Sequence, residues 1–244
     1  MEDKQARLIV AIDGPAAAGK GTIAYLIARK WHLLNLDSGA CYRAVAWLAR
    51  AHNIGIDAAH EDAIVSLLDT QPIQFRSNAL AEGPKAYVFV GGVDVTSAIR
   101  EEEISRLVPI VGEMVRVRAF VNALQHQLVA QTERGVVIEG RDTGSVVFPE
   151  AQLKYFLTAS LEVRAQRRHA ELVDRGKAVT FEQVYSDLQE RDRHDTEREY
   201  SSLRIAPGAV VIDNSSQTIE QVIEQMSAAI ALFLPPLSEI QEPK

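Results

Sequence analysis

The fold of this chain is decided by the stretch Gly14-Pro15-Ala16-Ala17-Ala18-Gly19-Lys20-Gly21-Thr22. It follows an apolar run over 8–12, which is typical of a buried parallel strand, and it precedes a helical pattern over 22–31. A glycine-rich loop between a strand and a helix points backbone N–H groups, and the positive end of the helix dipole, into one small volume. Lys20 adds a mobile charge there, and the hydroxyl of Thr22 can reach the shell of a magnesium ion. The stretch therefore predicts a loop that holds the phosphates of a nucleoside triphosphate.

The composition is that of an ordinary globular protein. The 244 residues are 47% hydrophobic and 24% charged, with a net charge of −7. That balance argues against a nucleic-acid binder, which needs a broad basic face. The lone Cys41 excludes an internal disulfide, and we expect it to be a small buried side chain. The first residues lack the apolar core of a signal peptide, and the apolar stretch 228–234 is too short to span a bilayer. We expect a cytoplasmic protein without a nucleic-acid or membrane partner.

Several common enzyme motifs are missing from the sequence. The six histidines are scattered, and none is grouped with cysteines or carboxylates at the spacing of a zinc site. There is no Gly-x-Ser-x-Gly elbow, which weakens a hydrolase interpretation, and no Gly-x-Gly-x-x-Gly, which disfavours a dinucleotide enzyme.

Further apolar runs predict a parallel sheet. Short strands are predicted at 33–36, 136–138, 154–157 and 210–213, and the one at 136–138 should be buried. Because they alternate with helical patterns, right-handed crossovers should join them into one parallel sheet. The long helical region 101–132 should end or kink at Pro109. Thr218 and Gln221 form a capping box for a last helix that reaches about residue 232.

The segment 56–100 has a different texture from the rest of the chain. A helix is predicted at 64–68, followed by strands at 73–75 and 87–90 with a loose turn over 78–85 between them. A small α+β unit of this size needs the larger core for its stability. We therefore expect an insert on the parallel sheet rather than an independent domain.

A second group of polar residues follows the strand at 33–36. Asp37, Ser38 and Gly39 should reach the same sheet edge as the phosphate loop, where ligands bind in open α/β sheets. Arg43 lies in the first turn of the next helix, where the helix dipole disfavours a cation. An anionic ligand in front of Arg43 explains this most simply, and a surface arginine is the alternative.

The region 165–195 is the most highly charged part of the chain. Arg164 and Arg168 lie four residues apart and share a helix face, and Arg191, Asp195 and Arg198 form one stripe at i, i+4 and i+7. The stripe is either a surface ion-pair ladder or a pair of forked cations for phosphates with a carboxylate for a sugar hydroxyl. The phosphate loop favours the second interpretation. The stretch 174–177 would suit a mobile cover that excludes water from bound nucleotides.

Taken together, these segments resemble the bacterial cytidylate kinases of the type with an enlarged insert for the nucleoside monophosphate. The resemblance runs from residue 9 to about residue 229. Its matching segments are 12–15 with 19–22, 36–43, 94–100, 140–149, and 191–192 with Asp195 and Arg198. The glycine between Lys20 and Thr22 is a variant typical of nucleotide and small-molecule kinases.

The resemblance implies one α/β domain over 1–244 with the fold of the P-loop NTPases, a parallel sheet flanked by helices. The core would comprise about 7–55, 101–163 and 192–234, with a small α+β insert for the monophosphate over 56–100. A helical lid would cover 164–191, and 235–244 would be a frayed tail.

The activity implied is transfer of the terminal phosphoryl group of ATP to CMP or dCMP with Mg²⁺, by a monomer. The residues expected to bind ATP are Gly14, Pro15, Ala16, Ala17, Ala18, Gly19, Lys20, Gly21, Thr22, Arg164 and Arg168, with Thr22 also on the metal. Those expected to bind CMP are Ser38, Tyr42, Arg43, Arg118, Arg141, Asp142, Arg191, Asp195 and Arg198. Lys20, Arg191 and Arg198 would be catalytic. Arg118 and Asp142 would recognise the cytosine edge, because a carboxylate accepts from its amine and repels the carbonyl of uracil.

The sequence departs from the family pattern at four places. Pro109 stands where the family usually has a serine that helps contact the base, and Val115 where it usually has proline. Ala17 replaces a loop glycine, which is tolerable only if its φ stays negative. The stretch 201–203 replaces the usual Ala-Pro-Leu. None of these departures removes a charge from the expected site, so we expect activity, with base selectivity or affinity as the properties open to change.

Two other functions compete with this interpretation. A kinase of a different small acceptor would have no need of the carboxylate of Asp142 beside Arg118. A nucleotide-binding switch that hydrolyses slowly would not need a second, arginine-lined site.

Overall fold

The computed structural model describes residues 7–77, 86–198 and 202–234. The turn predicted over 78–85, the tail predicted over 235–244 and the first residue of the 201–203 stretch lie outside the described residues.

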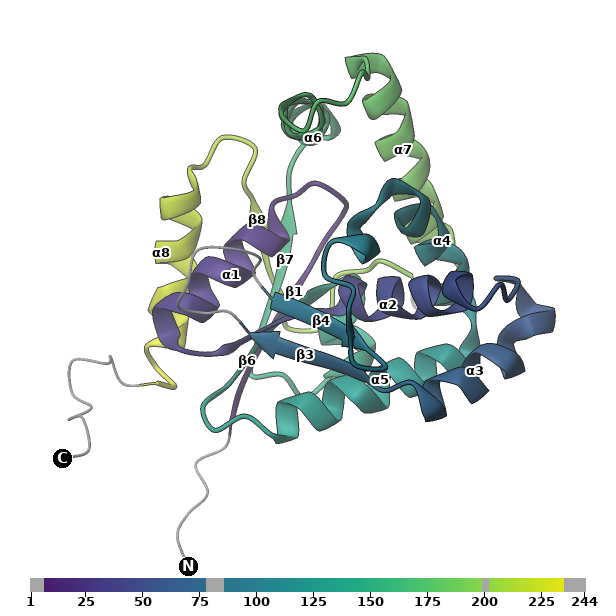
Figure 1. Cartoon of the computed structure of the whole chain (residues 1–244). Helices are drawn as coiled ribbons and strands as arrows, with labels where there is room; N and C mark the ends of the chain where they lie inside the picture. Colours follow the sequence, from purple (N-terminus) through teal and green to yellow (C-terminus); the bar gives the residue numbers. More distant parts are fainter. Residues whose placement is uncertain (1–6, 78–85, 199–201, 235–244) are drawn as a thin grey trace, which may run out of the picture.

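A five-stranded parallel sheet forms the centre of the molecule (Figure 1). In spatial order its strands are β2 (Leu34–Asp37), β6 (Gly135–Gly140), β1 (Leu8–Asp13), β7 (Leu153–Thr158) and β8 (Val210–Asp213). The α/β class and the strands predicted from apolar runs are confirmed. Asp13 pairs with Gly140, and Asp37 with Glu139, so these strands end together at one edge of the sheet.

Two layers of helices cover the sheet, because alternate side chains of β1 point to opposite faces. Leu8, Val10 and Ile12 pack against α1 (Lys20–Trp31) and α8 (Ile219–Ile230). Ile9 and Ala11 belong to the other core cluster, with α2 (Ser38–Ala51) and α5 (Val115–Ala130). Every residue of β1 is buried, as expected for the central strand of a doubly covered sheet.

The insert is a small antiparallel sheet beside these helices. Its elements are a 3₁₀ turn (Ala58–His60), α3 (Glu61–Thr70), β3 (Ile73–Ser77), β4 (Ala86–Val90), β5 (Val93–Asp94) and a second 3₁₀ turn (Ala98–Arg100). Ile64, Leu68 and Val88 join the same core cluster as α2. The unit therefore shares the main core, as predicted from its size, and the boundaries 56–100 stay a prediction.

The helical region that follows breaks later than predicted. Its first helix, α4 (Glu102–Glu113), contains Pro109 and continues for one more turn. Met114 then takes an extended conformation, with φ −69° and ψ 112°, and α5 begins. Proline removes one backbone hydrogen bond and costs a helix about 3 kcal/mol. Burial of Val111 and Met114 in the core favours continuation of the helix past the proline. Of the two predicted alternatives, the end at Pro109 is wrong and a kink there stays a prediction.

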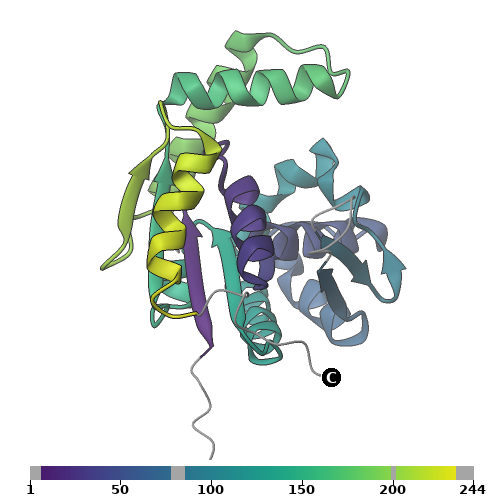
Figure 2. The same ribbon diagram turned by 90° about the vertical axis from the view of Figure 1, so that its left-hand side faces the viewer.

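Two helices project beyond the carboxyl ends of the strands (Figures 1 and 2). They are α6 (Leu161–Asp174), capped by Ser160, and α7 (Phe181–Glu197), with a capping box between Thr180 and Gln183. Ala165, Val184 and Leu188 form a small cluster with Ala16 of the phosphate loop. The capping box predicted at Thr218 and Gln221 is also confirmed, although α8 ends at Ile230.

The structure also tests the predicted burial of Cys41 and the absence of a membrane-spanning helix among the described residues. Cys41 is fully buried, and burial raises the pKa of its thiol, so it is the inert small side chain that was predicted. None of the described helices combines the length and hydropathy that crossing a bilayer requires.

Candidate active site

The phosphate loop turns sharply between β1 and α1. Gly14 has φ +151° and Gly19 φ +87°, both in the region that favours glycine. A Cβ atom on Gly14 would lie 2.0 Å from the carbonyl oxygen of Leu157, so the loop packs directly on the backbone of β7. Lys20 begins α1, and its Nζ donates to the carbonyl oxygen of Pro15 at 2.7 Å. The lysine thus folds back over the loop, as a phosphate-binding lysine would.

Ala17 contradicts the expectation of a negative φ. Its φ is +59°, in the left-handed region, where a residue with a Cβ atom costs roughly 1–2 kcal/mol. Its methyl group packs against the cluster of Ala16, Ala165, Val184 and Leu188. The turn of the loop therefore keeps the conformation that glycine would take, and contacts with α6 and α7 hold the alanine there.

One large cavity opens at the carboxyl ends of the strands. Its volume is about 410 Å³, within the range of ~300–1,000 Å³ that small-molecule sites occupy. Its lining carries nine basic and five acidic side chains, in a chain whose net charge is −7. A local excess of cations in an acidic protein indicates a small polyanionic ligand.

Most of the predicted site residues meet in this cavity. It is lined by Ala16, Ala17, Ala18, Gly19, Lys20, Gly21, Thr22, Ser38, Tyr42, Arg43, Arg118, Arg141, Asp142, Arg168, Arg191, Asp195 and Arg198. Gly14, Pro15 and Arg164 are not among its lining residues.

Arg164 and Arg168 both lie on α6, but their side chains have different surroundings. Arg164 is buried and donates to the carbonyl oxygens of Ala159 and Ala16, at 2.9 and 3.2 Å, and to Asp192 at 2.6 Å. It therefore connects α7 to the phosphate loop. Arg168 faces the cavity and is paired with Glu171 at 2.8 Å. An ATP contact remains a prediction for both residues, and the geometry favours it for Arg168.

The basic residues of the cavity repel one another. Burial, together with the charge of Arg141, lowers the pKa of Lys20 to about 7. Burial and Arg141 also lower the pKa of Arg191 to about 10. Within the described residues Arg191 has no hydrogen bond or ion pair. A bound anion would relieve this repulsion and restore the usual pKa of both groups.

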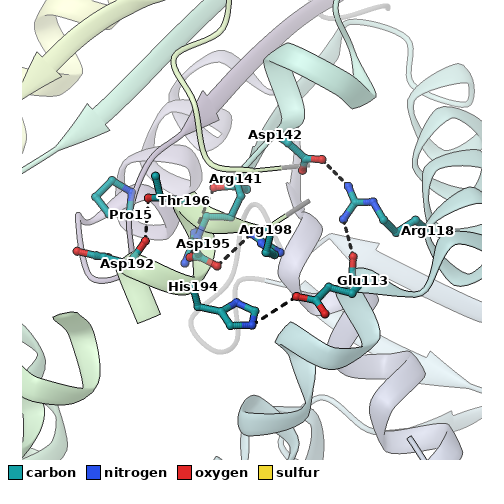
Figure 3. A network of polar contacts seen from close by, with 12 residues as sticks. Pro15, Glu113, Arg118, Arg141, Asp142, Asp192, His194, Asp195, Thr196 and Arg198 are labelled. Carbon is teal, nitrogen blue, oxygen red and sulfur yellow. Dashed lines mark hydrogen bonds and ion pairs between the residues drawn. The ribbon is translucent and has the colours of Figure 1, made fainter. Parts of the chain in front are cut away.

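All three residues of the stripe line the cavity, and Arg191 is exposed to solvent as well. Asp195 is buried and accepts from Arg141 Nε at 2.6 Å and from Arg198 Nη2 at 3.0 Å (Figure 3). Burial alone would raise the pKa of Asp195, but the charges of Arg141 and Arg198 lower it. The interpretation as an exposed ion-pair ladder is therefore wrong for Asp195. The carboxylate holds two arginines from distant parts of the chain at one point.

Arg118 and Asp142 form a buried ion pair at the other end of the cavity (Figure 3). Arg118 also donates to the carbonyl oxygen of Gly112 at 3.0 Å, and its guanidinium lies 5.5 Å from the ring centre of Tyr42. The hydroxyl of Tyr42 is buried and has no hydrogen-bond partner among the described residues. This end therefore offers a carboxylate, a guanidinium and a phenol to one ligand.

Asp13 holds the turn that carries Asp142. Its carboxylate accepts from the backbone N–H groups of Thr143 and Gly144, each at 2.8 Å, and from the hydroxyl of Thr143. Burial raises the pKa of Asp13, although these hydrogen bonds oppose the shift. Its position directly after a buried strand was the available signal, and the sequence analysis assigned it no role.

Arg43 lines the cavity and also forms an ion pair within the protein. It pairs with Asp37, the N-cap residue of α2, which also accepts from the N–H of Ala40 at 3.0 Å. Burial would raise the pKa of Asp37, but Arg43 and Arg100 lower it. The N-cap carboxylate therefore accounts for part of the stability of a cation at this helix start.

Four charged residues of the lining were not predicted. They are Arg100, Glu139, Glu171 and Arg175. Asp37 and Glu139 lie at the ends of neighbouring strands, which is a signal that the sequence contains. Burial and the charge of Asp37 raise the pKa of Glu139. Arg100 comes from the end of the insert, and only the tertiary structure brings it here.

The comparison with known families decides the classification. The family model described as cytidylate kinase matches residues 10–232. The chain belongs to the cytidylate kinase family. A cytidylate kinase of Pseudomonas syringae pv. tomato is 41% identical over 224 residues, which are 92% of this chain and 95% of that protein. The cytidylate kinase of Vibrio parahaemolyticus is 43% identical over 217 residues, 89% of this chain and 92% of its own. That of Streptococcus pneumoniae is 39% identical over 219 residues, with 90% and 95% covered.

The residues that match the cytidylate kinase family include those at both ends of the cavity. The match extends over the phosphate loop, the Arg118–Asp142 pair and the stripe on α7 alike. It therefore includes both the loop that many nucleotide-binding proteins have and the buried ion pair opposite it.

Proposed function

We propose that this member of the cytidylate kinase family transfers the γ-phosphoryl group of ATP to CMP or dCMP, giving ADP and CDP or dCDP. One observation carries the proposal: a single cavity joins the phosphate loop to the buried Arg118–Asp142 pair. A phosphate loop alone indicates only a nucleotide-binding protein. The second, arginine-lined end supplies a place for an acceptor that also bears a phosphate.

The half of the cavity around the loop would hold ATP. Its backbone N–H groups and the amino end of α1 suit the phosphates, with Lys20 and Arg168 as counter-charges. Thr22 lies in the first turn of α1 and lines the cavity. Its hydroxyl fits Mg²⁺, which takes few protein ligands and completes its shell with waters and substrate phosphates. When bound, the metal would neutralise phosphate charge.

The opposite half would hold the acceptor. Arg43, Arg141 and Arg198 would surround the monophosphate. Asp142 would accept from the exocyclic amine of cytosine, while Arg118 holds that carboxylate in place. The carbonyl that uracil presents there would be repelled by the carboxylate. Asp195 has lone pairs left for a sugar hydroxyl, since each of its oxygens accepts one protein hydrogen bond.

The chemistry is alignment and charge neutralisation. Phosphoryl transfer needs the attacking and leaving oxygens in line and cations around the moving group. Lys20, Arg191 and Arg198 would provide those cations between the two halves. Because Arg191 makes no ion pair among the described residues, its guanidinium is available to the group in transfer. A pre-formed cation of this kind lowers the barrier without reorganisation during the reaction.

The segment 164–191 is a suitable lid for this reaction. Gly176 lies between α6 and α7 with φ +73°, a conformation that gives the chain a sharp reversal there. Arg168, Glu171 and Arg175 line the cavity from this segment. Closure of the lid would exclude water, so that CMP rather than water accepts the phosphoryl group. The enzyme would act as a cytoplasmic monomer.

A coupled assay of ADP release with CMP, dCMP, UMP and AMP as acceptors tests the function. We expect turnover with CMP and dCMP in the presence of ATP and Mg²⁺. With UMP, kcat/KM should be at least about tenfold lower, because the strong hydrogen bond between the base and Asp142 is lost. A preference for UMP or AMP would refute the role of Asp142. ADP release that does not depend on any acceptor would instead favour a slow NTPase switch.

A further inference from the structure

We propose that Gln125 is a positioning residue for the acceptor phosphate, acting through the hydroxyl of Ser38. Its amide would hold that hydroxyl so that the hydrogen points into the cavity and donates to the monophosphate. The inference rests on the proposed function, because it names how one group of that site is oriented.

Gln125 is the polar exception on the inner face of α5. The buried neighbours on that face are Val117, Val121 and Val129, and Arg118 lies two turns before Gln125. The side chain of Gln125 is 0% exposed. A primary amide buried among valines costs roughly 1–3 kcal/mol unless it is hydrogen-bonded. An apolar side chain would serve the core better, so the amide needs an explanation in its contacts.

The amide reaches the acceptor half of the cavity through one hydrogen bond. Gln125 Nε2 donates to Ser38 Oγ at 3.1 Å, between residues 87 positions apart in the sequence. Ser38 is the first residue of α2 and lines the cavity, whereas Gln125 is not part of the lining. Gln125 therefore has no direct access to a ligand, and Ser38 is the lining residue through which it can act.

The direction of this hydrogen bond decides where the hydroxyl can donate. A serine hydroxyl has one hydrogen and two lone pairs, and one lone pair accepts from Gln125. Gln125 Oε1 is buried without a hydrogen-bond partner among the described residues, so it does not receive the hydrogen of Ser38. The hydroxyl hydrogen remains available for a ligand in the cavity that Ser38 lines.

The surroundings of Ser38 favour an anion as that ligand. Ser38 lies at the amino end of α2, where the helix dipole is positive, and Arg43 lines the cavity one turn later. A hydroxyl that donates into this region would give one oxygen of a bound phosphate a hydrogen-bond donor. The same hydroxyl without Gln125 would rotate freely and donate part of the time to other acceptors.

A double-mutant cycle between Gln125→Met and Ser38→Ala tests the inference. Methionine keeps the size of the side chain and removes the amide. We expect Ser38→Ala to lower kcat/KM for CMP by about tenfold, the usual effect of one hydrogen bond to a charged group, and Gln125→Met to lower it by a smaller factor of about fivefold, because the hydroxyl remains but is no longer oriented. In the Ser38→Ala background, Gln125→Met should change kcat/KM for CMP by less than about twofold, because its target is gone. The Kd for ATP should stay within about twofold in all three variants.

Gln127→Met is the matched control, because Gln127 lies on the same helix with an exposed side chain. It should leave kcat/KM for CMP unchanged. Independent, multiplying effects of the two substitutions would overturn the inference, as would an equal loss of ATP binding in Gln125→Met.

Gln125→Glu gives a second test that does not depend on the methionine variant folding. A carboxylate accepts and cannot donate, so it would draw the hydroxyl hydrogen of Ser38 away from the cavity. We expect kcat/KM for CMP to fall at least as far as in Gln125→Met. Wild-type kcat/KM in Gln125→Glu would overturn the inference. Failure of the proposed function is distinct, because the wild-type protein itself would then not phosphorylate CMP.

Discussion

Lys20 makes ATP binding depend on pH in a direction that the structure determines. The side chain is 5% exposed, and burial together with Arg141 lowers its pKa to about 7 from the usual 10.5. The nucleotide-free protein should therefore carry a neutral lysine in half of the molecules near pH 7. The phosphates of ATP bring negative charge to Nζ and raise its pKa, so ATP binding takes up a proton above pH 7.

The size of the effect follows from that pKa. Affinity for ATP should be full well below pH 7, where Lys20 is already protonated, and should fall as pH rises. Near pH 8 the neutral form exceeds the charged form about tenfold, so binding loses about 1.4 kcal/mol, and about 0.9 protons are taken up for each ATP bound. The stability of the folded protein depends on pH in the opposite direction to ATP affinity. Between pH 7 and 10.5 the unfolded chain binds the proton that the folded protein lacks, so Lys20 makes the nucleotide-free protein more stable as pH rises.

Titration calorimetry with ATP and Mg²⁺, in buffers of different ionisation enthalpy at several pH values, measures both quantities. Lys20→Arg is the control, because its guanidinium stays protonated throughout and it reports the titration of ATP alone. The difference between the two proteins should show the loss of affinity and the uptake of protons. Equal pH dependence in both proteins, without proton uptake in the wild type, would refute a lowered pKa for Lys20.

Three further predictions concern other parts of the site. Asp142→Ala should lower kcat/KM for CMP by at least about tenfold and leave the Kd for ATP within about twofold, since Arg118 loses its partner at the acceptor end only; equal losses for both substrates would contradict this. Arg198→Ala should cost about 3 kcal/mol of transition-state stabilisation in steady-state kinetics, and a rate near that of the wild type would exclude Arg198 as a phosphate clamp. Ala17→Gly should raise the free energy of unfolding by about 1 kcal/mol in urea denaturation, because it relieves the left-handed conformation; a decrease would show that the methyl contacts outweigh that strain.

Local chemistry made much of the fold predictable. Five apolar runs became the five parallel strands, and the central strand β1, which is buried on both faces, is apolar up to its last residue. The loop 14–22 and the capping box at Thr218 were recognised for the same reason, since each is a short pattern whose hydrogen bonds lie within a few residues. The end of α4 was not predictable from Pro109, because burial of Val111 and Met114 in the common core outweighs the local preference.

The sequence predicted which residues belong to the candidate site, but it did not predict most of the contacts between them. Arg118 and Asp142 were expected together, and the structure pairs them. The spacing of Arg164 and Arg168 is correct for one helix face, yet only Arg168 faces the cavity. Nothing near Gln125 in the sequence distinguishes it from a surface glutamine, because its partner Ser38 is 87 positions away.

By itself the sequence determined which chemical groups this protein possesses: a phosphate loop, a set of arginines and the apolar runs that make a parallel sheet. Their periodicity and order suffice for this, because strand and helix formation depend on neighbouring residues. Only the tertiary structure decided which arginine meets which carboxylate, which lysine has a lowered pKa and which serine accepts a hydrogen bond from a buried amide. Those outcomes depend on burial and on distances between residues far apart in the chain, and the free energy of a charge changes most where water is excluded.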